Sequence, residues 1–322
     1  MNKKYYPEID VCKGLGIILV VFGHALKQTG DTNTVFQILL SFIYSFHMPL
    51  FFMVSGFVSK KILEFTANGE RMKYIKSRAV RLLVPYFAVG LFYMPIKFVL
   101  SRFAVKPYDF SNAWKILIGE NPNTVLWFLY TLFWVSVVST FVIKKQNLNH
   151  MMIICGVVSL TAYLVQSPVE FPKYWFFFVA GMYLRINYEQ IISRLRGKNL
   201  ALVTTVFAIA NVILYVTGNY VFTFFTAISG CLCSLAAART IVQKEGIIYK
   251  ITEMCGKYSM DIYILSDLIA TAFRILVWGI LNMNYLVCAL VCFIAGMFLP
   301  IPVSKYIIQK VKIFKLLVLG IK

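Results

Sequence analysis

Long runs of apolar residues alternate with short polar segments along the whole chain. A helix that crosses a bilayer needs roughly 20 predominantly apolar residues, because the hydrocarbon layer is about 30 Å thick. About ten runs approach this length, the two near the middle of the chain being the shortest. They lie at residues 9–27, 35–58, 81–100, 125–143, 151–165, 173–186, 200–216, 220–239, 258–281 and 285–303. The pattern predicts an all-α polytopic integral membrane protein with about ten transmembrane helices.

The composition excludes an ordinary soluble fold. Of the 322 residues, 60% are hydrophobic and 14% are charged, whereas soluble domains carry about 25% charged residues. The polar segments between the apolar runs are short, so we expect no inserted soluble module. We therefore expect a single transmembrane domain that covers residues 1–322.

A formal net charge of +19 raises the question of a nucleic-acid partner. The basic residues, however, gather at alternate ends of the apolar runs, and the densest group lies at residues 60–81. Basic residues mark the cytoplasmic ends of transmembrane helices. If both termini are cytoplasmic, this side holds most of the 32 Lys and Arg residues. The distribution of the charge thus predicts a transmembrane topology, with membrane lipids around the protein. The sequence shows no aromatic-basic pattern of the kind that binds nucleic acid.

The seven cysteines lie in or beside apolar runs and form no C-x-x-C pair. Their odd number and their spacing are typical of free, unreactive thiols rather than of a disulfide framework. We expect no metal site.

Two of the three histidines lie inside the first two apolar runs. Burying an imidazole costs free energy unless the ring has hydrogen-bond partners, so the presence of His24 and His47 in these runs requires an explanation. Consecutive helices with a short link pack antiparallel, which predicts that the two histidines meet at one depth. Pro49 cannot donate a helix hydrogen bond, which opens the carbonyl of Ser45. Both a functional site and a pair of core histidines bonded to neighbouring hydroxyls remain open.

Lys13 and His24 share one face of the first predicted helix. Their separation of eleven residues corresponds to about 1,100°, or about 20° beyond three full turns, and to roughly 16 Å along the axis. Asp10 lies three residues before Lys13 and is placed to pair with it. The spacing predicts a polar path from the cytoplasmic rim to His24.

Arg78 and Arg81 lie three residues apart where the third apolar run begins, shortly before Tyr86. Two guanidinium groups on one helix face suit a phosphate or diphosphate group. Plain anchoring at the cytoplasmic surface explains the same residues equally well. The spacing alone leaves both interpretations open.

Four motifs follow one another along the chain. They are Asp10-x-x-Lys13-Gly14-x9-His24, Phe46-His47-Met48-Pro49-Leu50-Phe51-Phe52, Arg78-x-x-Arg81-Leu82-x-x-Pro85-Tyr86 and Leu126-Trp127-Phe128-Leu129. In this order they resemble the membrane-bound acyltransferase-3 family, the integral-membrane O-acyltransferases of bacterial surface sugars. The resemblance covers roughly residues 9–281.

The resemblance implies a role for each matched position. His24 matches the family's essential histidine, and Lys13 matches its basic partner, which is often arginine. Arg78 and Arg81 match the paired arginines that would hold the coenzyme A end of the donor. We expect His24 to act as general base, and His47 to orient groups or to help hold the oxyanion.

The implied activity is O-acyl transfer, most commonly of an acetyl group, from cytoplasmic acetyl-coenzyme A or a similar acyl-coenzyme A. The acceptor would be a sugar hydroxyl of a surface or lipid-linked glycan such as an exopolysaccharide. The implied location is the bacterial cytoplasmic (inner) membrane. Direct transfer in a ternary complex is favoured because the sequence offers no placed nucleophile, and an acyl-enzyme route stays open.

Four further residues are candidates for substrate binding: Asp10, Tyr86, Trp127 and Ser266. Trp127 has the chemistry to stack on a sugar, but interfacial belts account for most tryptophans in membrane proteins. Ser266 departs from the family pattern, because many members carry a histidine there. This departure implies either a dispensable histidine or a different acceptor or acyl group.

A polysaccharide flippase or exporter without chemistry is the alternative function. Such a protein needs polar groups along a path but no donor phosphate site at the cytoplasmic rim. The combination of His24 with Lys13, Arg78 and Arg81 therefore favours the acyltransferase.

Overall fold

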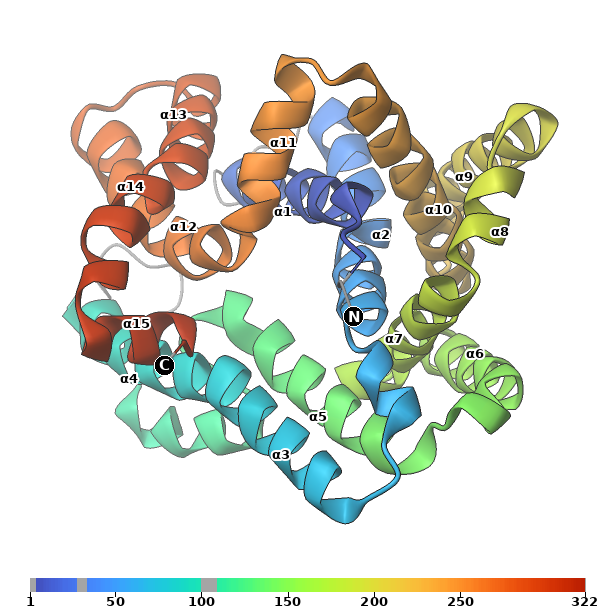
Figure 1. The fold of residues 1–322 in the computed structure, drawn as a ribbon. Helices are drawn as coiled ribbons and strands as arrows, with labels where there is room; N and C mark the ends of the chain where they lie inside the picture. The colour runs from blue at the N-terminus through green and yellow to red at the C-terminus, as the bar shows by residue number, and fades with distance from the viewer. Residues whose placement is uncertain (1–3, 28–33, 100–108, 322) are drawn as a thin grey trace. The chain divides into compact units, whose positions relative to one another are not determined.

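The computed structural model describes residues 4–27, 34–99 and 109–321, which form helices joined by turns (Figure 1). No strand occurs within those ranges. Nine of the helices described there are long and apolar enough to cross a membrane. The predicted all-α polytopic fold is thereby confirmed. The run predicted at residues 173–186 forms α7 (Glu170–Ile186), which is only 17 residues long and is not among the nine.

The described chain separates into two compact units. Unit 1 comprises residues 1–65 and 139–259, and unit 2 comprises residues 66–138 and 260–322. Unit 1 contains both candidate histidines, and unit 2 contains both candidate arginines. That the two units act as one transmembrane domain stays a prediction, as does the cytoplasmic location of the termini.

Unit 1 is built around the first two helices. Helix α1 packs against α2, α10 and α11, while α2 also packs against α7 and α10. Figure 1 shows the blue α1 beside the orange α11. The elements of unit 1 are α1 (Pro7–Lys27), α2 (Thr34–Val58), η1 (Lys60–Glu64), η6 (Lys145–Asn147), α6 (Leu148–Leu164), α7, α8 (Tyr188–Arg194), α9 (Gly197–Thr217), α10 (Val221–Lys244) and α11 (Ile247–Lys257).

Two glycines bring α1 and α11 into backbone contact. A Cβ on Gly14 would overlap the carbonyl of Thr252, and a Cβ on Gly256 would overlap the carbonyl of Asp10. Small residues allow such close approach between helices, as they do in membranes generally. These α11 residues were expected to lie in a polar connection between the apolar runs at 220–239 and 258–281. The structure makes them a helix that holds the polar end of α1.

A second pair of glycines fixes α2 against α7. A Cβ on Gly56 would overlap the carbonyl of Phe178, and a Cβ on Gly181 would overlap that of Met53. His47 lies earlier on the same α2, at a buried position. The close contact therefore sets the position of the helix that carries this histidine.

In unit 2 the third predicted span begins earlier than expected. Residues 60–81 were expected to form a basic connection, but α3 starts at Asn68 and continues through a π-helical segment into α4. Leu100, the expected end of this span, lies outside the described residues. The elements are α3 (Asn68–Arg78), η2 (Ala79–Leu83), α4 (Val84–Val99), η4 (Phe110–Ile118), η5 (Thr124–Leu126), α5 (Trp127–Val142), α12 (Ser259–Arg274), η7 (Ile275–Ile280), α13 (Tyr285–Phe298), α14 (Pro300–Tyr306), η8 (Ile308–Lys310) and α15 (Lys312–Leu319).

Candidate functional site

The two histidines contact the same tyrosine ring. The ring centroid of Tyr44 lies 5.0 Å from that of His47 and 6.2 Å from that of His24, both in edge-on geometry. His24 comes from α1 and is half-buried, whereas His47 comes from α2 and is 3% exposed. The structure thus brings together the two histidines that the sequence singled out.

A backbone hydrogen bond fixes the proton position of His47. Its Nδ1 atom lies 2.7 Å from the carbonyl oxygen of Ile43. A carbonyl oxygen only accepts, so Nδ1 donates, and in the neutral ring Nε2 keeps the lone pair. His47 therefore offers a fixed acceptor at Nε2. Within the described ranges, no group of three or more His, Cys, Asp or Glu side chains is placed to bind a metal ion.

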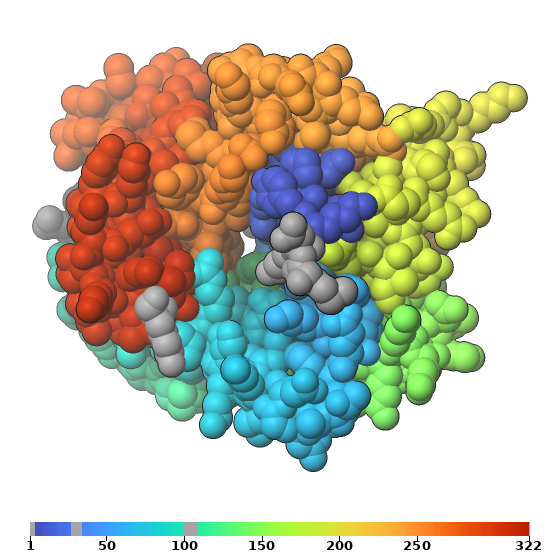
Figure 2. Space-filling model, in the orientation of Figure 1, coloured from blue at the N-terminus to red at the C-terminus, as the bar shows by residue number. Residues whose placement is uncertain are grey.

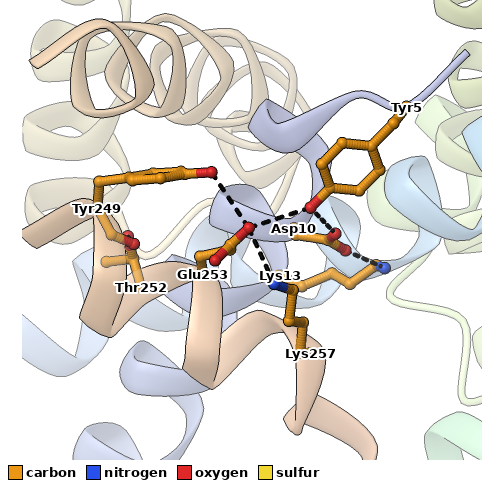
Figure 3. A network of polar contacts seen from close by, with 7 residues as sticks. All are labelled: Tyr5, Asp10, Lys13, Tyr249, Thr252, Glu253 and Lys257. Atoms are coloured by element: carbon orange, nitrogen blue, oxygen red, sulfur yellow. Dashed lines mark hydrogen bonds and ion pairs between the residues drawn. The ribbon is translucent and has the colours of Figure 1, made fainter. Parts of the chain in front are cut away.

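Lys13 forms the ion pair that the sequence predicted. Its Nζ atom lies 2.8 Å from Oδ1 of Asp10, and both side chains are largely buried. Tyr5 donates its hydroxyl proton to the other Asp10 oxygen over 2.8 Å. Figure 3 shows this group at the start of α1, facing α11. Asp10 thus positions Lys13, and its own two oxygens are occupied.

The same network continues onto α11 through Glu253, which sequence reasoning missed. Its Oε1 atom accepts from Tyr249 at 3.1 Å and lies 3.0 Å from Nζ of Lys257 (Figure 3). It also lies 3.2 Å from the Tyr5 hydroxyl, whose one proton is shared between Glu253 and the nearer Asp10. The Lys257 hydrogen bond lowers the pKa of Glu253, and the Glu253 hydrogen bond raises the pKa of Lys257. Their spacing of four residues was the available signal.

A small basic pocket lies at this same end of unit 1. It measures about 330 Å³ and is lined by Tyr6, Lys60, Lys145 and Arg185 among others. The Arg185 guanidinium carbon lies 4.1 Å from the centroid of the Tyr6 ring. Figure 2 shows the blue start of α1 at the surface, bordered by the orange α11 and the yellow α8. We call this surface, which comprises the start of α1, the end of α7 and the pocket lined by Tyr6, Lys60, Lys145 and Arg185, the near end of unit 1.

In unit 2 the two candidate arginines have different partners. Arg78 donates from Nε to the hydroxyl of Tyr74 over 2.8 Å and also lies over that ring. Arg81 donates from Nη1 to the carbonyl of Leu319, the last residue of α15. The arginines therefore do not form one fork, because the π-helical segment Ala79–Leu83 changes the helical spacing between them.

Arg81 lines a basic cavity of about 900 Å³. Lys73 and Lys76 of α3 line it as well, together with Gly320 and Ile321 after α15. Its lining residues, among those that the structure describes, include three cations and no acid, a chemistry that suits phosphate groups. Sequence reasoning missed both lysines, because it counted them with the general positive charge of this segment.

The other three candidates for substrate binding, Tyr86, Trp127 and Ser266, lie in separate environments within unit 2. Tyr86 is fully buried, and its hydroxyl donates to the carbonyl of Ile116 over 2.9 Å, which ties α4 to η4. Trp127 is half-buried at the start of α5. Ser266 is 6% exposed on α12. The predicted substrate-binding roles of Tyr86, Trp127 and Ser266 stay predictions.

Comparison with known proteins identifies the family. Residues 6–303 match the acyltransferase-3 family model, described as an acyltransferase domain. Nodulation protein NolL of Sinorhizobium fredii is 29% identical over 206 residues, which cover 59% of this chain and 52% of the relative. The chain thus matches about half the length of that relative. No solved structure matches the chain.

Proposed function

Because the chain belongs to the acyltransferase-3 family, we propose that it transfers an acetyl or similar acyl group from acyl-coenzyme A to a sugar hydroxyl. The acceptor belongs to a surface or lipid-linked glycan, and the enzyme works as a multi-pass protein of the bacterial inner membrane. The observation that carries the proposal is the meeting of His24 and His47 at Tyr44 inside the family-matched region.

The proposed chemistry needs one proton acceptor and one positioning group. His24 takes the proton of the sugar hydroxyl while the hydroxyl oxygen attacks the thioester carbonyl carbon. The carbon–sulfur bond breaks, and His24 returns the proton to the departing thiolate. His47, fixed through its Nδ1 bond to Ile43, presents Nε2 as an acceptor that orients the reacting groups.

The donor is assigned to the basic cavity of unit 2. Coenzyme A carries a diphosphate and a further phosphate, and Lys73, Lys76 and Arg81 offer three cations around about 900 Å³. Arg81 is held by the Leu319 carbonyl, so its guanidinium is positioned before the donor arrives. The assignment predicts that this cavity faces the cytoplasm, where acyl-coenzyme A is made.

Reconstitution tests the function directly. The purified full chain in lipid nanodiscs, given acetyl-coenzyme A labelled in the acetyl group and a glycan fraction, should move the label into the glycan and release coenzyme A. Movement of glycan across vesicles without any acyl transfer would instead favour the exporter.

Thiol labelling tests the orientation on which the donor assignment depends. A cysteine in place of Asn68, at the start of α3, should resist an impermeant thiol reagent in intact cells and react after permeabilisation. Native cysteines are buried or half-buried, so the unsubstituted chain is the background control. Labelling in intact cells would contradict the cytoplasmic assignment.

A further inference from the structure

A second cavity of unit 1 lies at the opposite end from the near end. It measures about 700 Å³, inside the roughly 300–1,000 Å³ of typical small-ligand sites. It lies where α2, α7 and α10 begin and where α6 and α9 end, which we call the far end of unit 1. Five tyrosines line it: Tyr44, Tyr163, Tyr174, Tyr215 and Tyr220. Tyrosine offers both a flat ring for stacking and a hydroxyl for hydrogen bonding.

The described lining of this cavity has balanced charge. Its charged residues, among those that the structure describes, are Glu170 and Lys173, which pair at 3.3 Å. The described lining of the pocket at the near end, in contrast, has three cations, Lys60, Lys145 and Arg185, and one acid, Glu64. An anion such as coenzyme A gains little in a cavity without excess positive charge, whereas neutral hydroxyl groups find both donors and acceptors there.

The edge of the cavity keeps a strained residue. Gln166 has φ +48°, a left-handed conformation that costs a non-glycine residue free energy. The chain uses glycine for the same conformation at Gly218, which also lines the cavity and has φ +62°. Glutamine at the first position supplies an amide that glycine lacks.

The cavity borders the tyrosine that contacts both candidate histidines. Tyr44 lines the cavity and contacts both imidazole rings. His24 and His47 themselves are not among the described residues that line it. A ligand held among the tyrosines therefore lies against the ring that both histidines contact.

We propose that the far-end cavity binds the acceptor, that the acceptor portion bound there is an uncharged, hydroxyl-rich sugar, and that Gln166 and Glu170 determine its specificity. This inference rests on the proposed function and adds the acceptor's place and chemical class. It separates an uncharged acceptor site in unit 1 from the basic donor cavity described in unit 2.

Thiol protection tests binding without requiring turnover. A cysteine in place of Ser167, or of Thr223 on the other wall, should react with a small polar maleimide in the full chain. Methyl glucoside, galactoside and mannoside at millimolar concentrations, and neutral oligosaccharides, are the probes. At least one should slow labelling severalfold at both positions, whereas glucose 1-phosphate and acetyl-coenzyme A should not. Protection by the anions alone, or by no sugar at either position, would overturn the proposal.

Kinetics test the two specificity residues. Gln166→Gly relieves the strain and removes the amide, so it should keep or raise thermal stability while raising the acceptor KM about tenfold, the effect of losing one good hydrogen bond. Glu170→Gln should also raise the acceptor KM, and both variants should leave the acetyl-coenzyme A KM unchanged. Gln190→Ala and Glu189→Gln on the exposed face of α8 are matched controls.

The outcomes separate this inference from the function on which it rests. A changed donor KM with an unchanged acceptor KM would overturn the acceptor assignment. Folded variants with neither KM changed would overturn it as well. Protection by neutral sugars in a wild-type chain that transfers no acyl group would support the sugar site but contradict the proposed acyltransferase reaction.

Discussion

In unit 1 the candidate histidines come from two α-helices that close glycine contacts hold in place, whereas in unit 2 Arg81 lies within a π-helical segment. His47 takes its partner from its own helix, one turn back. Arg81 takes its partner from α15, more than two hundred residues away in the sequence. The hydrogen bond that fixes His47 is thus local, whereas the one that fixes Arg81 joins distant segments of the chain.

This difference matches the chemistry that we assign to each unit. A proton acceptor must hold its geometry closely during transfer, which favours a rigid helical frame. A cavity that binds a large, flexible anion tolerates more movement, and π-helical turns often occur at such functional positions. A second π-helical segment, Ile275–Ile280, also lies in unit 2. The comparison therefore predicts that variants of unit 1 affect rate and stability, and that variants of unit 2 affect donor affinity.

The largest expected effect is on the rate. His24→Asn should fold, insert and bind acetyl-coenzyme A, but transfer about 10²–10⁴-fold more slowly, because an amide does not accept a proton near neutral pH. His47→Asn keeps a hydrogen-bonding group and should cost less. Single-turnover transfer, measured beside donor binding, checks both. An inactive His47→Asn with an active His24→Asn would assign the base to His47, and two active variants would refute acid–base catalysis by this pair.

The second largest expected effect is on the affinity for the acyl donor. Arg81→Ala should weaken acetyl-coenzyme A binding by about 1.5–3 kcal/mol, the usual value of a charged hydrogen bond. Arg81→Lys should restore part of it, because lysine keeps the charge but loses the planar fork. Equilibrium binding to the purified chain measures this directly.

A matched control separates binding from structure, since Arg81 also holds α15 through Leu319. Lys73 and Lys76 line the same cavity, so the double variant Lys73→Ala, Lys76→Ala should weaken binding and keep the thermal midpoint. Arg78 pairs with Tyr74 instead, and Arg78→Ala should weaken binding less. Unchanged affinity in folded Arg81 and lysine variants would return these cations to a purely topological role.

The sequence predicted those features that depend on local spacing. The apolar runs, the pair of Lys13 and Asp10, and the meeting of His24 and His47 all follow from helical periodicity and from short links between helices. Family resemblance added the two arginines and their expected role. The predicted fold class and the predicted ion pair between Lys13 and Asp10 are confirmed.

Features that depend on distant contacts were not predictable in this way. No local sequence pattern indicates that Gly14 approaches the backbone of Thr252. Nor does one indicate that Arg81 holds the end of α15, just before Gly320. The start of α3 was missed because its dense charge is typical of a polar connection, although α3 continues directly into an apolar span. Lys73 and Lys76, which line the basic cavity of unit 2, belong to the same charged segment and were therefore not singled out.

Helix packing in unit 1 should be sensitive to a single methyl group. Gly256→Ala places a Cβ where the carbonyl of Asp10 lies, so α1 and α11 must separate. Such overpacking costs about 1–3 kcal/mol, to be measured as a lower thermal midpoint in detergent. Gly279→Ala in unit 2 is the control, because nothing lies within 4 Å of its added Cβ. Equal effects of the two variants would contradict the close α1–α11 contact.

The smallest expected effect is the pH dependence of the contact between Glu253 and Lys257 on α11. The pKa of Glu253 lies below its ordinary 4.5, because Lys257 donates a hydrogen bond to its carboxylate. Its stabilising contribution is therefore present above pH 4.5 and is lost as the pH falls through the lowered pKa. The pKa of Lys257 lies above its ordinary 10.5, so its contribution is lost only as the pH rises through that raised value. Between these limits the contact should not depend on pH.

Thermal unfolding at pH 7 and pH 3 measures this contribution. Between pH 7 and pH 3 the wild-type midpoint should fall by about 1 °C more than that of Glu253→Gln, as expected for a partly exposed ion pair in a chain of this size. Glu64→Gln, which removes the exposed pair with Lys60, controls for general acid effects. If the Glu253→Gln and wild-type midpoints fall equally, the network on α11 does not stabilise the near end of unit 1.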